Sequence, residues 1–196
     1  YSPLDIGDRL HIVPAWQPPE APAGRVCVLI DPGQAFGTGT HETTQLVAEL
    51  MESRIPVGGT VFDVGTGSAL LAIAAVKLGA GAAIGVDNDP VAIASARENL
   101  SLNAVEDLVE VYVADSPQRL RPGQHPLVLA NIISSILRSL RDAIVARVEP
   151  GGTLLVSGVL ATEEDAFRAD FIPAGWTVVE RRTKAEWLAL ALRAPA

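Results

Sequence analysis

The stretch Val61-Phe-Asp-Val-Gly-Thr-Gly-Ser-Ala-Leu-Leu-Ala-Ile-Ala-Ala75 decides the fold. Its first residues are mostly apolar, as in a central parallel strand whose two faces are both covered. Gly65 and Gly67 allow a tight turn and let a ligand approach the backbone closely. The residues from Ala69 to Leu78 favour a helix, whose free N–H groups and positive dipole end point at whatever lies over the turn. The stretch therefore predicts a strand–turn–helix unit that binds a nucleotide.

Further strands and helices alternate after this unit. With the strand over 61–64, we expect seven strands, the others over 83–87, 109–114, 126–131, 154–158, 177–181 and 186–192. Helices are expected over 90–103, 134–148 and 162–171, with Asp89 as the N-cap of the first and Pro90 at its first helical position. This alternation predicts an α/β fold with a doubly wound, mostly parallel sheet. Only a few residues separate the last two strands, which predicts a C-terminal antiparallel hairpin.

The N-terminal part of the chain differs in composition. Residues 1–24 are rich in proline, and we interpret them as a linker or N-terminal extension that carries one short strand over 10–13. Residues 25–196 are expected to form a single domain, long enough to enclose a full core and beginning with a strand over 26–30. Because the chain starts at Tyr1 rather than Met, we expect that the natural N-terminus was trimmed or lies outside this sequence.

Composition excludes several classes of function. The formal net charge of −8 argues against nucleic acid as a direct partner and is compatible with a basic protein partner. Cys27 is the single cysteine, which rules out an internal disulfide and favours a cytoplasmic protein. No stretch approaches the roughly 20 apolar residues of a membrane span. Three scattered histidines and one cysteine offer no spaced cluster for a metal.

Polar residues end several of the predicted strands. In open α/β sheets, ligands bind beyond the carboxyl ends of the strands, which points to Asp63, Asp87, Asp115 and Asn131. Asp87 follows Gly65 at about 20 residues, the spacing at which a carboxylate meets a ribose diol. Asp115 either accepts from an adenine amino group or simply ends its strand. Asp63 either orients the glycine turn or meets a ligand's ammonium group.

The glycine turn narrows the choice of ligand. A dinucleotide fingerprint requires G-x-G-x-x-G, whereas Gly65-Thr-Gly-Ser-Ala-Leu70 lacks the third glycine. The stretch also has no P-loop lysine, so pyrophosphate binding is the weaker interpretation. A nucleoside without phosphates fits better, and we expect S-adenosylmethionine as the cofactor.

A second glycine-rich stretch, Asp31-Pro-Gly-Gln-Ala-Phe-Gly-Thr-Gly-Thr-His-Glu-Thr-Thr44, precedes this unit. It is either an ordinary surface loop that ends in a helix cap or a segment that wraps a ligand. Phe36 and His41 favour the second interpretation. Thr40 or Thr43 is expected to cap a helix that runs to about Ser53.

These motifs resemble those of a known family. Asp63-Val-Gly-Thr-Gly-Ser68 is similar to the general signature of class I S-adenosylmethionine-dependent methyltransferases. In combination with the stretch from Asp31 to Thr44, Ala130-Asn-Ile132 and Glu186-Trp187, it resembles the ribosomal protein L11 methyltransferases over about residues 4–193. The resemblance implies a Rossmann-like methyltransferase fold with a seven-stranded sheet.

The resemblance also implies roles for individual residues. It implies cofactor contacts from Thr44, Gly65, Asp87 and Asn131, and a catalytic role for Asn131 in holding the acceptor nitrogen. His41 or Glu42 is a candidate for removing a proton from the acceptor. The full set of expected cofactor-binding residues is Phe36, Gly37, Thr38, Thr44, Asp63, Gly65, Gly67, Asp87, Asp115 and Asn131.

The chain departs from the family pattern at two places. Ala69 replaces the family's usual glycine at the start of the helix. The family also carries an N-terminal domain that captures its ribosomal substrate, whereas only residues 1–24 precede the predicted domain here. We therefore expect either that the sequence lacks that domain or that this is a shortened relative with another substrate.

The resulting functional prediction is methyl transfer from S-adenosylmethionine to protein amino groups. The acceptor is expected to be a lysine ε-amine or an N-terminal amine, with ribosomal protein L11 the leading substrate and the enzyme acting as a monomer. Two alternatives remain: a methyltransferase for another protein or a small-molecule amine, and a cofactor-binding module without turnover.

Overall fold

The computed structural model describes residues 2–31, 33 and 41–196, and it confirms the α/β fold with a mostly parallel sheet. The sheet has seven strands, in the order β6 (Val109–Val113), β5 (Ala82–Asp87), β4 (Thr60–Val64), β7 (His125–Asn131), β8 (Val148–Leu160), β10 (Trp187–Arg193) and β9 (Thr177–Lys184). Strand β10 runs antiparallel to both of its neighbours, and the other pairs are parallel. The predicted C-terminal hairpin is therefore confirmed.

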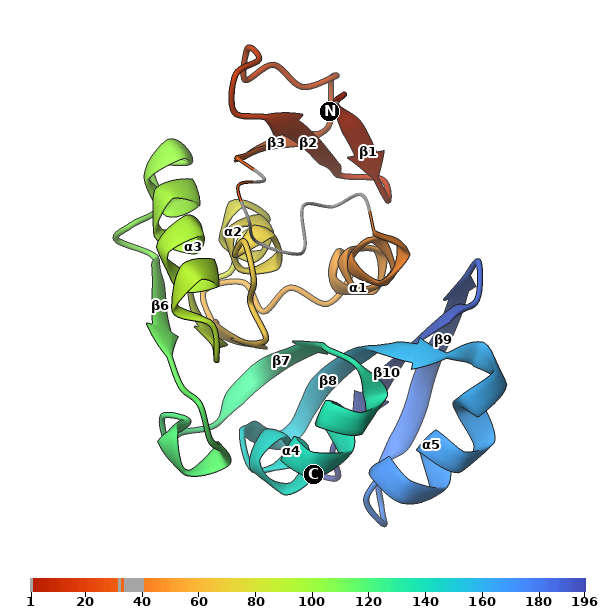
Figure 1. Ribbon diagram of the computed structural model, residues 1–196. Helices are drawn as coiled ribbons and strands as arrows, with labels where there is room; N and C mark the ends of the chain where they lie inside the picture. The colour runs from red at the N-terminus through yellow and green to blue at the C-terminus, as the bar shows by residue number, and fades with distance from the viewer. Residues whose placement is uncertain (1, 32, 34–40) are drawn as a thin grey trace.

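Helices cover both faces of this sheet (Figure 1). One face packs against α1 (Glu42–Met51), α2 (Leu70–Lys77) and α3 (Pro90–Leu102), and the other against α4 (Ser134–Val145) and α5 (Glu164–Phe171). Two short 3₁₀ turns, η1 (Pro117–Arg119) and η2 (Ala161–Glu163), complete the described elements. Helix α2 is buried from Leu70 to Val76, which explains why it is apolar on every side.

A separate three-stranded sheet packs on the outer side of α1, α2 and α3 (Figure 1). It consists of β1 (Leu4–Ile6), β2 (Leu10–Pro14) and β3 (Val26–Ile30), with β1 antiparallel and β3 parallel to β2. Strand β1 was not predicted, since three residues of LDI carry little pattern. The sheet joins residues on both sides of position 24, and the division into 1–24 and 25–196 stays a prediction.

Several predicted boundaries shift in the structure. Asp89 caps α3 through its side chain and Pro90 opens the helix, as predicted. Strand β8 begins at Val148, earlier than predicted, because the chain already pairs with β7 there, and this ends α4 at Val145. The N-cap of α1 is His41, whose Nδ1 accepts from the Thr43 N–H, so the assignment of this cap to Thr40 or Thr43 was wrong.

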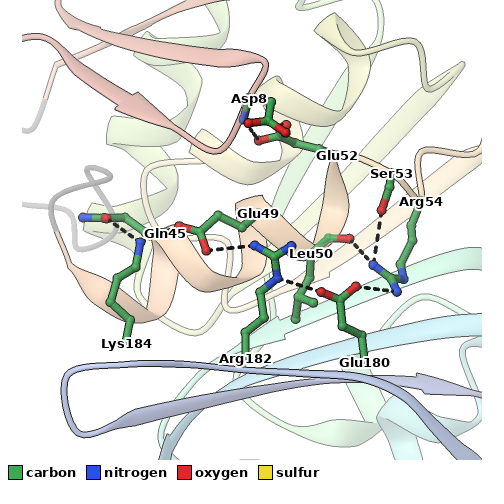
Figure 2. A network of polar contacts seen from close by, with 10 residues as sticks. All are labelled: Asp8, Gln45, Glu49, Leu50, Glu52, Ser53, Arg54, Glu180, Arg182 and Lys184. Carbon is green, nitrogen blue, oxygen red and sulfur yellow. Dashed lines mark hydrogen bonds and ion pairs between the residues drawn. The ribbon is translucent and has the colours of Figure 1, made fainter.

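Polar contacts attach α1 and the residues just after it to neighbouring elements on two sides (Figure 2). The carboxylate of Glu52 accepts from the Asp8 N–H at 3.0 and 3.1 Å. Gly7 turns tightly against this carboxylate, since a Cβ there would lie 1.6 Å from Glu52 Oε1. Burial raises the pKa of Glu52. The C-terminal end of α1 is thereby fixed to the turn between β1 and β2.

The opposite side of α1 binds the edge strand β9 (Figure 2). Arg182 contacts Glu49 at 3.3 Å, and Lys184 donates to the same carboxylate. Beyond the helix end, Arg54 pairs with Glu180 at 2.9 Å. Helix α1 thus links the N-terminal sheet to the hairpin at the far end of the chain.

We expect Glu49→Gln to lower the free energy of unfolding by about 1 kcal/mol, because one partly buried carboxylate serves two cations. Chemical denaturation measures this change, and its size should shrink in about 1 M salt, which screens ion pairs. The control is Glu98→Gln, an exposed carboxylate on α3. An equal loss of stability in the two variants would contradict a stabilising role for the ion pairs of Glu49 with Arg182 and Lys184.

Candidate active site

The turn between β4 and α2 closes against the segment that follows β7. Gly65 and Gly67 have φ of 75° and 54°, in the left-handed region that favours glycine. A Cβ on Gly65 would lie 2.3 Å from Ile132 Cγ2, so the turn and this segment are in close contact. Ala69 also has a positive φ, of 66°, which explains why a glycine suits this position in the family pattern.

Asp87 holds this turn from the neighbouring strand β5. Its Oδ2 accepts from the Gly67 N–H at 2.9 Å, and its Oδ1 accepts from the Asp89 N–H at 3.0 Å. Each carboxylate oxygen has two lone pairs, so both can accept a further hydrogen bond from a ligand hydroxyl. Sequence spacing predicted the ribose role, but the bond to the turn was not predicted.

Asp63 is a buried carboxyl group at the end of β4. Its Oδ2 accepts from Thr66 Oγ1 at 2.8 Å, while its Oδ1 is buried and has no partner in the described part of the chain. The pKa of Asp63 is raised to about 7: burial is the main cause, the Thr66 hydrogen bond lowers the pKa, and the nearby Asp87 charge makes a smaller contribution that raises it. An unpartnered buried oxygen at a ligand-binding edge calls for a donor, and a ligand ammonium group fits.

Glycine at position 85 makes room for this hydrogen bond. Gly85 lies beside Asp63 in the β4–β5 register. A Cβ on Gly85 would lie 2.5 Å from Thr66 Oγ1, so any larger residue would displace the hydroxyl that binds Asp63.

Asn131 lies at the end of β7 and reaches across to α1. Its Nδ2 donates to Thr44 Oγ1 at 3.1 Å, which leaves the amide oxygen as its acceptor atom. Ile132, the residue after Asn131, packs closely against Gly158 of β8. A Cβ on Gly158 would lie 2.0 Å from the Ile132 carbonyl oxygen. The structure therefore brings together Thr44, Asn131 and Gly65, which the sequence places far apart.

The remaining predicted site residues are less closely associated with the Gly65 turn. Asp115 follows β6, where its side chain is 71% exposed and pairs with Arg119 at 3.4 Å. Phe36, Gly37 and Thr38 lie outside the described residues. The His41 ring packs 5.4 Å from that of Trp187, and its Nδ1 also meets Thr43 Oγ1 at 2.8 Å. The described contacts of His41 are thus those of a helix cap.

One buried residue near the turn, Asn99, was not predicted. Asn99 of α3 donates to the Ser68 carbonyl at 3.0 Å and also bonds the backbone of Asp31. The sequence signal that could have identified Asn99 is a polar amide at a helix position that faces the core, where an apolar residue is usual.

The structure also bears on metals and membranes. Within residues 2–31, 33 and 41–196, no group of three or more His, Cys, Asp or Glu side chains is arranged to hold a metal ion. Over the same residues, no helix combines the length and apolar character needed to cross a bilayer.

A family model described as "Ribosomal protein L11 methyltransferase (PrmA)" matches residues 1–195. The chain belongs to the ribosomal protein L11 methyltransferase family. Membership of a methyltransferase family agrees with S-adenosylmethionine, the cofactor expected from the turn.

Relatives named ribosomal protein L11 methyltransferase support the assignment. The protein of Geobacter metallireducens is 43% identical over 195 residues, covering 99% of this chain. That of Pelobacter propionicus is 42% identical, covering 98% of this chain. The chain spans 63% of the length of each of these curated relatives.

Solved structures confirm the fold of this L11 methyltransferase family member. The ribosomal protein L11 methylase of Lactobacillus delbrueckii subsp. bulgaricus has a TM-score of 0.83 at 29% identity, and all of each chain is covered. An RNA methyltransferase of Salinibacter ruber, solved with S-adenosyl-L-homocysteine, has a TM-score of 0.58 at 18% identity, with 76% of this chain and 90% of that chain covered. The second likeness concerns the fold alone.

We expect the stability of the unliganded protein to fall as pH rises through the titration of Asp63. The folded state keeps the proton up to about pH 7, whereas an ordinary Asp releases it near 3.8. Between these values the folded state binds more protons than the unfolded state, so its stability decreases with rising pH. Asp63→Asn removes this titration, so its stability relative to wild type should increase by on the order of a few kcal/mol between about pH 4 and 7.

Chemical denaturation across this pH range measures the difference. Asp115→Asn is the matched control, since Asp115 also follows a strand end but is exposed. Parallel stability curves for wild type and Asp63→Asn would contradict a buried, late-titrating carboxyl group.

Proposed function

We propose that this chain binds S-adenosylmethionine over the Gly65 turn and transfers its methyl group to amino groups of a protein. Ribosomal protein L11 is the leading substrate, because the curated relatives carry that name. One observation carries the proposal: Asn131, held by Thr44, begins the segment that packs against the glycine turn. A cofactor site and an amine-binding group are therefore adjacent.

The described residues fit the cofactor. The free lone pairs of Asp87 suit a ribose diol, and the unpartnered Oδ1 of Asp63 suits the ammonium of the methionine part. Gly65 and Gly67 supply the open backbone turn, and Asp115 follows the adjacent strand, where an adenine amino group is expected. Contacts from Phe36, Gly37 and Thr38 remain part of the proposal on sequence grounds alone.

The chain's own residues then prepare the acceptor. S-adenosylmethionine supplies a methyl group already activated by a sulfonium, so the reaction needs an aligned amine lone pair more than a strong base. Asn131 Oδ1 accepts a hydrogen bond from the neutral amine and thereby directs its lone pair. The Thr44 hydroxyl holds the amide in this orientation. Exclusion of water from the site favours the neutral amine over its ammonium form.

A lysine ε-amine or an N-terminal amine fits Asn131, and so does the amine of another protein or a small molecule. A binding module without turnover has no use for an acceptor-amine group, which favours the enzyme.

We also propose that residues 1–24 are an extension of a domain over 25–196, and that the protein acts as a cytoplasmic monomer. The charge of −8 disfavours direct nucleic-acid binding.

Asp87→Ala should weaken the binding of S-adenosylhomocysteine by tenfold or more, measured by calorimetry. Loss of a charge-assisted hydrogen bond costs roughly 1.5–3 kcal/mol, and the turn also loses its bond at Gly67. Asp107→Ala, an exposed carboxylate in the connection that precedes β6, is the control. Unchanged affinity in Asp87→Ala would remove this residue from the cofactor site.

Asn131→Ala should keep cofactor affinity within a few fold but lower methyl transfer by about a hundredfold, since misplacement of the acceptor has an effect of this size. The assay incubates the protein with ribosomal protein L11 and S-adenosylmethionine labelled in its methyl group. Ser139→Ala, on the exposed side of α4, is the control. Activity equal to that of wild type would exclude Asn131 from catalysis. If the label appeared on another protein or on a small amine and not on L11, that molecule would be the substrate instead of L11.

A further inference from the structure

Asn99 of α3 and Asn103, the C-cap of this helix, face the edge strand β3 of the small sheet. Asn99 and Asn103 are separated by one helical turn, and their exposed fractions are 0% and 8%. Strand β3 pairs with β2 on one side only, so the backbone groups on its other side need different partners.

Each amide binds both backbone groups of a single residue. Asn103 Oδ1 accepts from the Leu29 N–H at 2.8 Å, and its Nδ2 donates to the Leu29 carbonyl at 2.7 Å. Asn99 Oδ1 accepts from the Asp31 N–H at 2.9 Å, and its Nδ2 lies 3.4 Å from the Asp31 carbonyl. The amides therefore bind β3 much as the peptide groups of a neighbouring strand would.

The spacing explains why this arrangement works. Side chains four residues apart on a helix lie about 5–6 Å from one another. Residues two apart on a strand point the same way and lie about 6.6 Å from one another. Asn99 and Asn103 therefore match the two outward-facing residues Leu29 and Asp31.

Asn99 differs from Asn103 in one further contact. Its Nδ2 also donates to the Ser68 carbonyl at 3.0 Å, within the glycine turn. Ser68 lies between Gly67, whose N–H binds Asp87, and Ala69, whose φ is 66°. The turn is thus held by Asp87 on its N–H side and by Asn99 on its carbonyl side.

We propose that Asn99 is a positioning residue for the cofactor site, which sets the glycine turn relative to Asp31, the residue that follows β3. The proposal rests on the proposed binding of S-adenosylmethionine over the turn. Without the Asn99 amide, the buried Ser68 carbonyl and the Asp31 N–H lose their partner, and the strained turn relaxes toward a conformation that binds the cofactor less well. Asn103 does not touch the turn, so its loss should affect stability only.

The test compares Asn99→Ala with Asn103→Ala in the full chain. Calorimetry measures affinity for S-adenosylhomocysteine, and chemical denaturation measures stability. Both variants should lose stability, whereas only Asn99→Ala should weaken affinity, by tenfold or more. In the methylation assay, the same variant should raise the cofactor KM with a smaller change in kcat. Asn99→Ser keeps a short hydrogen-bonding side chain and should recover part of the affinity that Asn99→Ala loses. If Asn99→Ala does not fold, Asn99→Ser takes its place in the comparison with Asn103→Ala.

The outcomes separate this inference from the function on which it rests. If wild type does not bind S-adenosylhomocysteine, the proposed function fails. If wild type binds and the Asn99 and Asn103 variants change affinity equally or not at all, the positioning role is wrong. A loss confined to the Asn99 variants supports it.

Discussion

The active site depends on the parallel pairing of β4 with β7. In the sheet order, β4 is followed on one side by β5 and on the other by β7, so the chain reverses its direction of winding between them. The register places Val64 beside Ala130, and the residues that follow leave the sheet side by side. The Ile132 side chain can pack against Gly65 there because glycine has no Cβ. The proposed binding positions of the methyl donor and the acceptor therefore lie side by side.

Sequence pattern predicted the large sheet well because its strands are apolar runs bounded by polar or glycine residues. Asp63, Gly65, Asp87 and Asn131 were predicted as site residues for the same reason, since each ends a recognisable strand or begins a turn. A sequence pattern relates residues that are near one another in the chain, so it does not reveal contacts that only the folded chain creates. Asn99 meets Ser68 and Asp31 across the fold, and nothing in the local sequence around Asn99 indicates either partner.

The cap of α1 shows a different limit. Threonine is a better general N-cap than histidine, which made Thr40 and Thr43 the natural choices. The structure instead uses His41, whose ring also packs near Trp187 of β10. A tertiary contact outweighs the local preference there. Similarly, β1 has only three residues and exists because β2 pairs with it and α1 holds the following turn through Glu52.

The amide contacts of α3 have a consequence for solubility as well as for the site. A strand with one unpaired side offers a row of N–H and C=O groups to which a second chain can add. In this protein, Asn99 and Asn103 occupy those groups at Leu29 and Asp31. Asn99, which also contacts the turn, and Asn103 therefore shield the outer edge of β3 from the addition of a strand of a second chain.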